Sequence, residues 1–253
     1  MENEGYSLTA KSKFAKALDS FVFSYFTLSG SRDLLKVEIN YADRLHVLPT
    51  LFDEKTIALG EVVSTRRLSN DELIASKINA LIVRTTPRDI YDVYNLFNGG
   101  LADSSLIKKT ALFYVALGSE VPVDFEKLFN DCLAKIDSIT YNKLRGTLIP
   151  VLHKEEKINI DEFKTFVANR LKNLFLLDEN EKKFFERFNS GIFDQKLLFG
   201  DLIQTDLKYH PMVLWKTVFR VMEEIRKEAV RNGTAGMSLE EINAEIKAVR
   251  NGK

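Results

Sequence analysis

The period of the hydrophobic pattern changes near residue 100, and this change constrains the fold more than any other feature of the sequence. Residues 20–28 are rich in aromatic and β-branched side chains, residues 34–41 alternate between apolar and polar, and Ser29-Gly30-Ser31 lies between them. Two strands joined by a glycine-containing turn have this pattern, so a β-hairpin is predicted. A further strand is expected over residues 56–64.

Two consecutive helices are predicted after these strands. Ser69 and Glu72 have the spacing of a capping box, in which the serine hydroxyl accepts from a backbone N–H and the glutamate reaches back to the cap. The second helix is expected to begin with Thr86 as its N-cap, Pro87 in its first position and Asp89 in its first turn. In the first helix an apolar stripe recurs at helical spacing, and we expect it to pack on the sheet; it consists of Leu73, Ile74, Ile78, Leu81 and Ile82.

Beyond Leu101 the sequence has helical periodicity almost throughout. Helices are expected over residues 104–117, 124–136, 140–152, 161–177, 179–188, 212–231 and 237–249. The predicted fold class is therefore α+β, with a mixed sheet and helices followed by an all-helical domain. The expected divisions are an α/β domain over residues 1–100, a helical bundle over 101–231, and a hinge with an amphipathic helix over 232–253.

Composition narrows the range of functions. The 36 basic residues equal the 36 acidic ones, so the bulk charge supports neither a strongly basic nucleic-acid sleeve nor an acidic tail. Cys132 is the single cysteine, which excludes an internal disulfide framework and indicates a reducing compartment. The longest apolar runs are far below the ~20 residues that a membrane-spanning helix needs. We therefore expect a soluble, cytoplasmic protein without a membrane partner.

The charged residues between positions 77 and 92 form the most informative cluster. Lys77 and Arg84 are seven residues apart, so they nearly superimpose at the edge of the apolar stripe of one helix. Arg88, Asp89 and Asp92 follow at the start of the next helix. Cations that neutralise phosphate oxygens, beside carboxylates that orient them or hold Mg²⁺, suit a polyphosphate. The alternative is structural: Asp89 serves the helix N-terminus, and Arg88 and Asp92 form an ordinary ion pair.

Other polar residues offer weaker candidates. Glu38 lies on an alternating strand, where its carboxylate faces either solvent or a cleft, and Arg44 and His46 follow the end of that strand. The three histidines, His46, His153 and His210, are too scattered for a metal-site motif, and no nucleophile elbow is present, which excludes common hydrolase designs. At the helix start near His210, we expect packing, with Met212, Leu214 and Trp215 entering the core.

Three segments of the chain are distinctive: KVEINYADRLHVLP, ELIASKINALIVRTTPRDIYDVYNLF and HPMVLWK. They resemble the AbiEii/AbiGii toxin family, the nucleotidyltransferase component of type IV toxin–antitoxin systems, and the similarity runs from about Asp19 to Lys216. The resemblance implies a nucleotidyltransferase-like mixed sheet followed by helices. It also implies binding of a nucleoside triphosphate with Mg²⁺, and transfer of a nucleotide to an RNA acceptor such as tRNA.

Carried onto this sequence, the resemblance assigns roles to six residues. It implies catalytic roles for Lys77, Asp89 and Asp92, nucleotide binding by Lys77, Arg84 and Arg88, and metal binding by Glu38. A cognate antitoxin is the partner that such a toxin implies.

The sequence departs from the family pattern in one respect. A Gly-Gly-Ser/Thr loop followed by an Asp-x-Asp pair is absent from all 253 residues. Two-metal phosphoryl chemistry needs carboxylates that hold both ions. We therefore expect a partial nucleotidyltransferase-like domain that begins after the catalytic motif and is inactive alone, so that a missing N-terminal segment or separate chain completes the site. The alternative is a non-catalytic binding or regulatory remnant of such a toxin.

Overall fold

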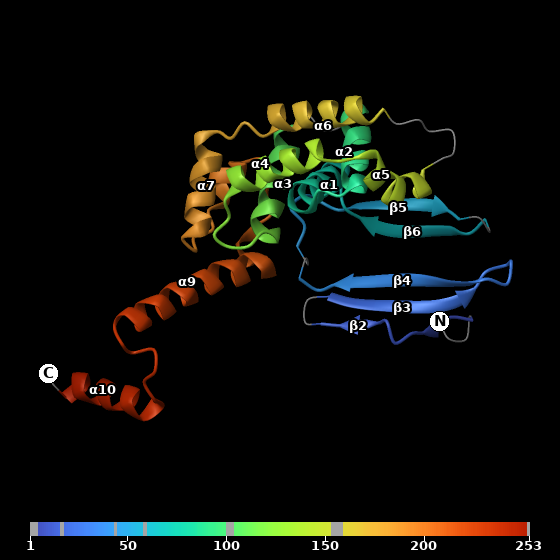
Figure 1. Ribbon diagram of the computed structural model, residues 1–253. Coiled ribbons are helices and arrows are strands. Elements are labelled where there is room, and N and C mark those ends of the chain that lie inside the picture. The colour runs from blue at the N-terminus through green and yellow to red at the C-terminus, as the bar shows by residue number, and fades with distance from the viewer. Residues whose placement is uncertain are drawn as a thin grey trace.

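The computed structural model combines a small sheet, a separate β-hairpin and a helical body (Figure 1). It describes residues 5–15, 18–42, 45–57, 60–99, 104–152 and 159–251. The α+β fold class predicted from the sequence is confirmed. Every strand pairing among the described residues is antiparallel.

The predicted β-hairpin forms the centre of the small sheet. Strand β3 (Leu18–Phe26) pairs with β4 (Arg32–Asn40) along its whole length. Gly30 lies in the turn between them with a φ of 78°, a left-handed conformation that glycine adopts without a steric penalty. Two short strands, β1 (Ser7–Leu8) and β2 (Lys13–Phe14), pair with the other edge of β3.

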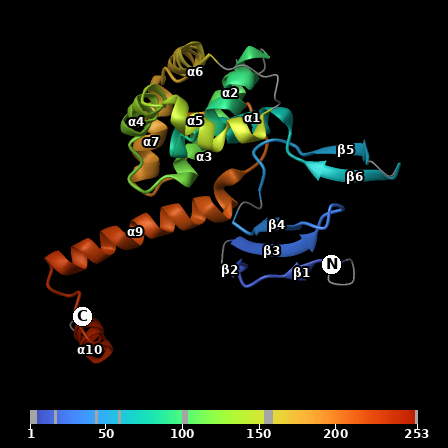
Figure 2. The same cartoon turned by 45° about the vertical axis from the view of Figure 1, so that its right-hand side comes forward.

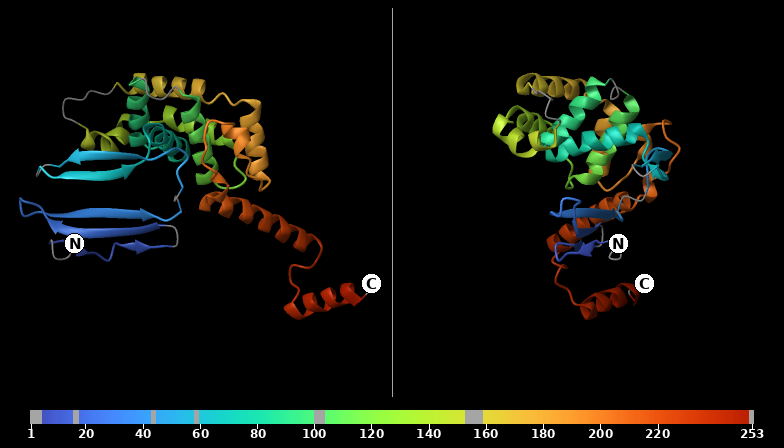
Figure 3. Two further views of the ribbon diagram at one scale, coloured as in Figure 1. Left: turned by 180° about the vertical axis from the view of Figure 1, so that it is seen from behind. Right: turned by 90° about the vertical axis from the view of Figure 1, so that its right-hand side faces the viewer.

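The strand expected over residues 56–64 is wrong, because the chain reverses within that segment. β5 (Leu51–Thr56) and β6 (Val62–Arg67) form a second hairpin, with Thr56 opposite Val62. Gly60 has a φ of 80° and donates its N–H to the carbonyl of Ile57, which closes the turn. Figures 1 and 3 show this hairpin between the first sheet and the helical body.

Every helix expected from the sequence has a counterpart in the structure. The helices are α1 (Asn70–Arg84), α2 (Pro87–Asn98), α3 (Ser105–Gly118), α4 (Phe125–Asp137), α5 (Tyr141–Thr147), α6 (Ile160–Leu174), α7 (Glu179–Asn189), α8 (Gln195–Phe199), α9 (Pro211–Arg231) and α10 (Leu239–Asn251). Helix α5 is shorter than expected, because Pro150 cannot donate a helical hydrogen bond and the chain passes into a 3₁₀ turn there. Helix α8 was not predicted, since five residues are too few to show a period.

Helix α1 packs on α2, α3 and α4 rather than on the sheet, so the predicted partner of its apolar stripe is wrong. Its buried residues, such as Ile78 and Leu81, join one hydrophobic core that runs from Val47 to Val213. This core crosses the boundary expected at residue 100. The reason lies in α3, whose consecutive buried residues from Thr110 to Phe113 cover every side of the helix, so that it must be surrounded by other helices.

Of the two hydrogen bonds in the capping box predicted for α1, the structure contains one. The Ser69 side chain accepts from the backbone N–H of Glu72, as expected. The Glu72 carboxylate does not return to the cap; instead it is fully buried and accepts from the backbone N–H groups of Val47 and Leu48 at 2.8 and 3.1 Å. The Tyr114 hydroxyl of α3 also donates to it. Glu72 therefore joins the segment before β5 to the helical body.

The Ser69 cap provides a direct test of how α1 begins. Replacing Ser69 with alanine removes an acceptor for a first-turn N–H and is expected to lower the free energy of unfolding by about 1 kcal/mol. Ser76→Ala in the same helix is the matched control, because that hydroxyl donates to the carbonyl of Leu73 inside the helix rather than accepting from a first-turn N–H. The control should change stability by less than about 0.5 kcal/mol in urea denaturation. Equal effects of the two substitutions would contradict the capping role.

The C-terminal helices extend away from the helical body (Figure 2). Val213 and Lys216 in the first turns of α9 are buried, whereas Leu214 and Trp215 are exposed, which corrects the expectation that both enter the core. The remainder of α9 and all of α10 carry exposed apolar side chains; these include Val218, Val221, Met222, Ile225, Leu239, Ile242, Ile246 and Val249. Among the described residues, no helix has the length and apolarity to cross a membrane.

Cys132 lies on α4 inside the core. Its side chain is completely buried, and its thiol donates to the carbonyl of Leu81 on α1 at 3.5 Å. Burial raises the pKa of the Cys132 thiol to about 11. The cysteine therefore acts as a small apolar contact between α1 and α4.

Candidate functional site

The charged residues between positions 77 and 92 line a single pocket. Lys77, Arg84, Arg88, Asp89 and Asp92 all contribute to a cavity of about 870 Å³. The pocket lies where the C-terminal half of α1 and the N-terminus of α2 face the end of α4 and helix α5. This grouping was predicted from the helical spacing of Lys77 and Arg84 and from the helix start at Pro87.

The turn between α1 and α2 brings these residues together. Thr85 caps α1 with φ 52° and ψ 54°, the left-handed backbone conformation that residues other than glycine rarely adopt. Its hydroxyl donates to the carbonyl of Leu81, which satisfies one of the last carbonyls of the helix. Thr86 and Pro87 then begin α2 as predicted, with Thr86 as N-cap and Pro87 in the first position. The short reversal places the end of α1 against the first turn of α2.

Asp89 is the most buried charged residue of the pocket. Its side chain is 3% exposed, and the carboxylate accepts from the Arg84 guanidinium at 2.6 and 2.9 Å. It also accepts from the Thr86 hydroxyl at 2.6 Å and the Thr86 backbone N–H at 3.1 Å. Both carboxylate oxygens are thus occupied within the chain. The geometry gives Asp89 a positioning function: it closes a capping box and holds Arg84.

The ion pair with Arg84 sets the protonation state of Asp89. Burial acts to raise the pKa of Asp89, but hydrogen bonds from Arg84 and Thr86 outweigh it, so the pKa lies below its ordinary value of 3.8. The hydrogen bond to Asp89 correspondingly raises the pKa of Arg84. Arg84 itself is 63% exposed, so its outer face remains open to the pocket and to solvent. A fixed, permanently charged guanidinium of this kind suits recognition of phosphate.

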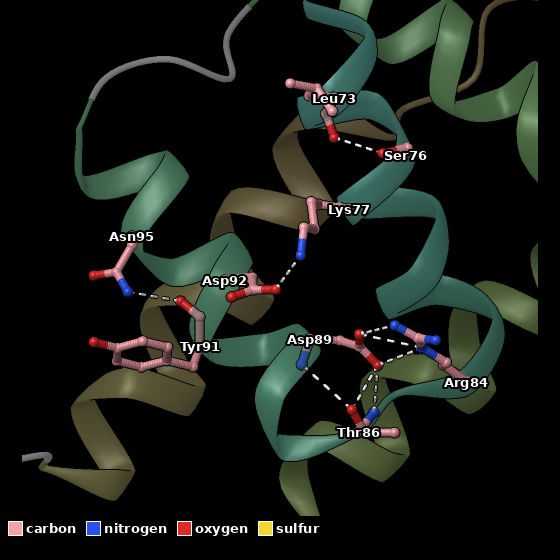
Figure 4. Close-up of polar contacts among 9 residues, drawn as sticks. All are labelled: Leu73, Ser76, Lys77, Arg84, Thr86, Asp89, Tyr91, Asp92 and Asn95. Carbon is pink, nitrogen blue, oxygen red and sulfur yellow. Dashed lines mark hydrogen bonds and ion pairs between the residues drawn. The ribbon is translucent and has the colours of Figure 1, made fainter. Parts of the chain in front are cut away.

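Lys77 and Asp92 form the second ion pair. The ammonium of Lys77 reaches from α1 to the carboxylate of Asp92 on α2 at 2.7 Å (Figure 4). Both side chains are partly exposed, so the pair can exchange its mutual contact for contacts with a ligand. The alternative ion pair between Arg88 and Asp92 does not form, because Arg88 turns toward α5 and donates to the Thr147 carbonyl at 2.9 Å.

Two further lysines, which were not predicted from the sequence, line the pocket. Lys135 lies in the last turn of α4 and Lys143 in α5, and both are exposed. They are about 50 residues away from the predicted cluster along the chain, and only the packing of α4 and α5 against α1 and α2 brings them there. Five cations and two carboxylates therefore line the pocket, which favours anions.

Glu38 is not brought to this pocket. It lies on β4, is partly exposed and pairs with Lys36 at 2.7 Å. Within the described ranges, no three histidine, cysteine, aspartate or glutamate side chains are arranged to hold a metal ion. Asp92 is the pocket carboxylate with an exposed side chain, and Mg²⁺ is commonly held by one or two carboxylates together with substrate phosphates and water. The metal-binding function of Glu38 stays a prediction.

The other polar candidates that the structure describes, His46 and His210, do not line the pocket. His210 is completely buried, caps α9 through Nδ1, which accepts from the Met212 backbone N–H at 3.1 Å, and packs against Phe113. His46 is partly buried near Glu72, which contacts the neighbouring backbone. Arg44 and His153 lie outside the described residues.

Comparison with known proteins gives the family of the chain. No curated protein and no solved structure matches it. A family profile, described as nucleotidyl transferase AbiEii toxin of type IV toxin–antitoxin systems, matches residues 2–196. This range covers more than half of the chain and every residue that lines the pocket. The chain belongs to the AbiEii family of nucleotidyl transferase toxins.

Proposed function

We propose that the pocket binds the phosphate groups of a nucleoside triphosphate. Lys77, Arg84 and Arg88 contact the phosphates, and Asp89 holds Arg84 in place. Asp92 orients Lys77 and, where Mg²⁺ accompanies the nucleotide, offers one carboxylate to it. The observation that carries this proposal is the excess of cations in one pocket, two of them fixed by carboxylates on the neighbouring helix.

The proposed reaction is transfer of a nucleotide from the triphosphate to an RNA acceptor, once the active site is complete. Membership of the family supports nucleotidyl transfer and a cognate antitoxin. Mg²⁺, when bound with the nucleotide, supplies neutralisation of charge on the phosphates. The contribution of this chain is to bind and orient, because Lys77 and Arg84 supply fixed positive charge without covalent chemistry. The second candidate is a non-catalytic binding module, favoured by the hydrogen bonds that occupy both oxygens of Asp89.

Calorimetric titration of the full chain with ATP, GTP, CTP and UTP in the presence of Mg²⁺ tests nucleotide binding. Lys77→Ala is expected to weaken binding about tenfold or more, since a charge-assisted hydrogen bond contributes about 1.5–3 kcal/mol. Asp92→Ala is expected to change the affinity both with and without Mg²⁺, because Asp92 orients Lys77, and the change should be larger with Mg²⁺, to which its carboxylate is also offered. Lys183→Ala on α7 is the matched control, because that lysine is exposed and does not line the pocket.

The two candidate functions differ in one further measurement. Incorporation of labelled nucleotide into RNA by the wild type, lost in Lys77→Ala and retained in Lys183→Ala, would support the transferase. Nucleotide binding without incorporation is the result expected of the binding module and also of a transferase whose active site is incomplete. If no nucleoside triphosphate binds to the wild type, or if Lys77→Ala binds as tightly as the wild type, the proposal is overturned.

A further inference from the structure

The charges of the pocket are unevenly compensated. On the side formed by α1 and α2, both carboxylates are committed: Asp89 pairs with Arg84 and Asp92 pairs with Lys77. On the opposite side, the wall formed by α4 and α5 contributes Lys135 and Lys143 and no carboxylate. Among the residues that the structure describes, neither lysine has an ion-pair partner. Three pocket cations therefore lack a carboxylate partner: Arg88 on α2, which donates to the Thr147 carbonyl, and the two lysines of the α4–α5 wall.

The positions of the two lysines are fixed by local structure. Lys135 lies in the last turn of α4, where the helix dipole favours a cation, and its backbone carbonyl accepts from the Ser138 hydroxyl. Lys143 follows the short connection to α5, and its carbonyl accepts from the Thr147 hydroxyl. Arg88 of α2 donates to the carbonyl of the same Thr147, which ties α5 to the side of the pocket that carries the paired cations. The α4–α5 wall is thus anchored opposite the proposed nucleotide site.

We infer that Lys135 and Lys143 form a second anion subsite. This subsite holds a phosphate group of the acceptor, while the side of the pocket formed by α1 and α2 holds the triphosphate. This inference rests on the proposed function. The cavity, at about 870 Å³, is near the upper end of the range of about 300–1,000 Å³ for ligand pockets, so it has room for groups from two ligands. The chemistry of two exposed ammonium groups recognises phosphate without reading a base, so the subsite positions an acceptor and does not select its sequence.

Two kinds of acceptor carry this phosphate chemistry, and paired binding measurements distinguish them. One probe is a fluorescent single-stranded RNA oligonucleotide, which offers backbone phosphodiesters. The other is a nucleoside monophosphate, which offers a phosphate monoester. Each is titrated against the wild type, against Lys135→Ala/Lys143→Ala, and against the matched control Lys127→Ala/Lys172→Ala, whose lysines are exposed and lie outside the pocket.

The double substitution of the pocket lysines is expected to weaken RNA binding at least tenfold. It should also reduce the slope of log affinity against log salt concentration by about 1.4, since each phosphate contact to a single strand contributes about 0.7. Affinity for the nucleoside triphosphate should stay within twofold of the wild type. A matching loss for the monophosphate would identify a general phosphate subsite, whereas a loss for RNA alone would identify a phosphodiester subsite; either supports the inference.

The inference and the proposed function fail in different ways. Unchanged RNA affinity and salt slope in the double variant, together with unchanged monophosphate affinity, would overturn the second subsite. An equal loss of triphosphate affinity would also overturn it, because both lysines would then belong to the nucleotide site. If the wild type binds no triphosphate but its RNA affinity still depends on both lysines, the proposed nucleotide site fails while the phosphate-binding wall remains.

Discussion

Replacing Asp89 with alanine is expected to lower the free energy of unfolding by about 3 kcal/mol, the sum of a charge-assisted hydrogen bond and a helix cap. The substitution removes the acceptor for the Arg84 guanidinium and for two donors of Thr86 at once. Urea denaturation measures the change. Asp92→Ala is the matched control, because its ion pair is partly exposed and should contribute less than about 1 kcal/mol. Equal effects of the two substitutions would show that Asp89 does not hold the junction of α1 and α2.

The same carboxylate gives this stability a defined pH dependence. Because the pKa of Asp89 is lower in the folded chain than its ordinary value of 3.8, the ionised form stabilises the fold. That contribution is present in full at pH values above 3.8 and is lost as the pH falls through the lower pKa of the folded state. The stability difference between wild type and Asp89→Asn should therefore be constant near neutral pH and shrink in acid. A difference that grows on acidification would contradict the sign of the shift.

Replacing Glu72 with alanine is expected to have a larger effect, about 3–5 kcal/mol, since three donors then lose their acceptor inside the protein. Two of these donors are the backbone N–H groups of Val47 and Leu48, and the third is the Tyr114 hydroxyl. Chemical denaturation followed by circular dichroism measures the loss. Glu72→Gln keeps one acceptor oxygen and should fall between alanine and wild type. Glu54→Ala on β5 is the control, because that side chain is exposed; a Glu72→Ala variant as stable as this control would refute the interpretation.

Short-range patterns predicted the parts of the fold that depend on neighbouring residues. The hairpin around Gly30 and the caps at Ser69 and Thr86 follow from interactions within a few residues, and the structure contains each of them. The partner of the Glu72 carboxylate could not be predicted in this way. The capping box and the observed contact with Val47 and Leu48 use the same acceptor, and burial against α3 favours the longer-range contact.

The residues of the candidate site also fall into those that local spacing predicts and those that only helix packing brings together. Lys77 and Arg84 are two helical turns apart, and Pro87 fixes the start of the next helix, so the sequence already places five charged residues together. Lys135 and Lys143 reach the pocket only through the packing of separate helices, which periodicity does not encode. The metal-binding role of Glu38 was implied by the family resemblance, whereas its strand pattern specifies only the two faces of a sheet and not what lies beyond them.

The position of Cys132 has a practical consequence for experiments on the pocket. A thiol enclosed between α1 and α4, with a pKa of about 11, is nearly all protonated at neutral pH and is shielded from reagents. The native chain should therefore give almost no background with maleimide dyes. A cysteine introduced at an exposed position would then be the single reactive group, so a fluorophore or spin label attached there would report on its own surroundings without removal of the natural residue.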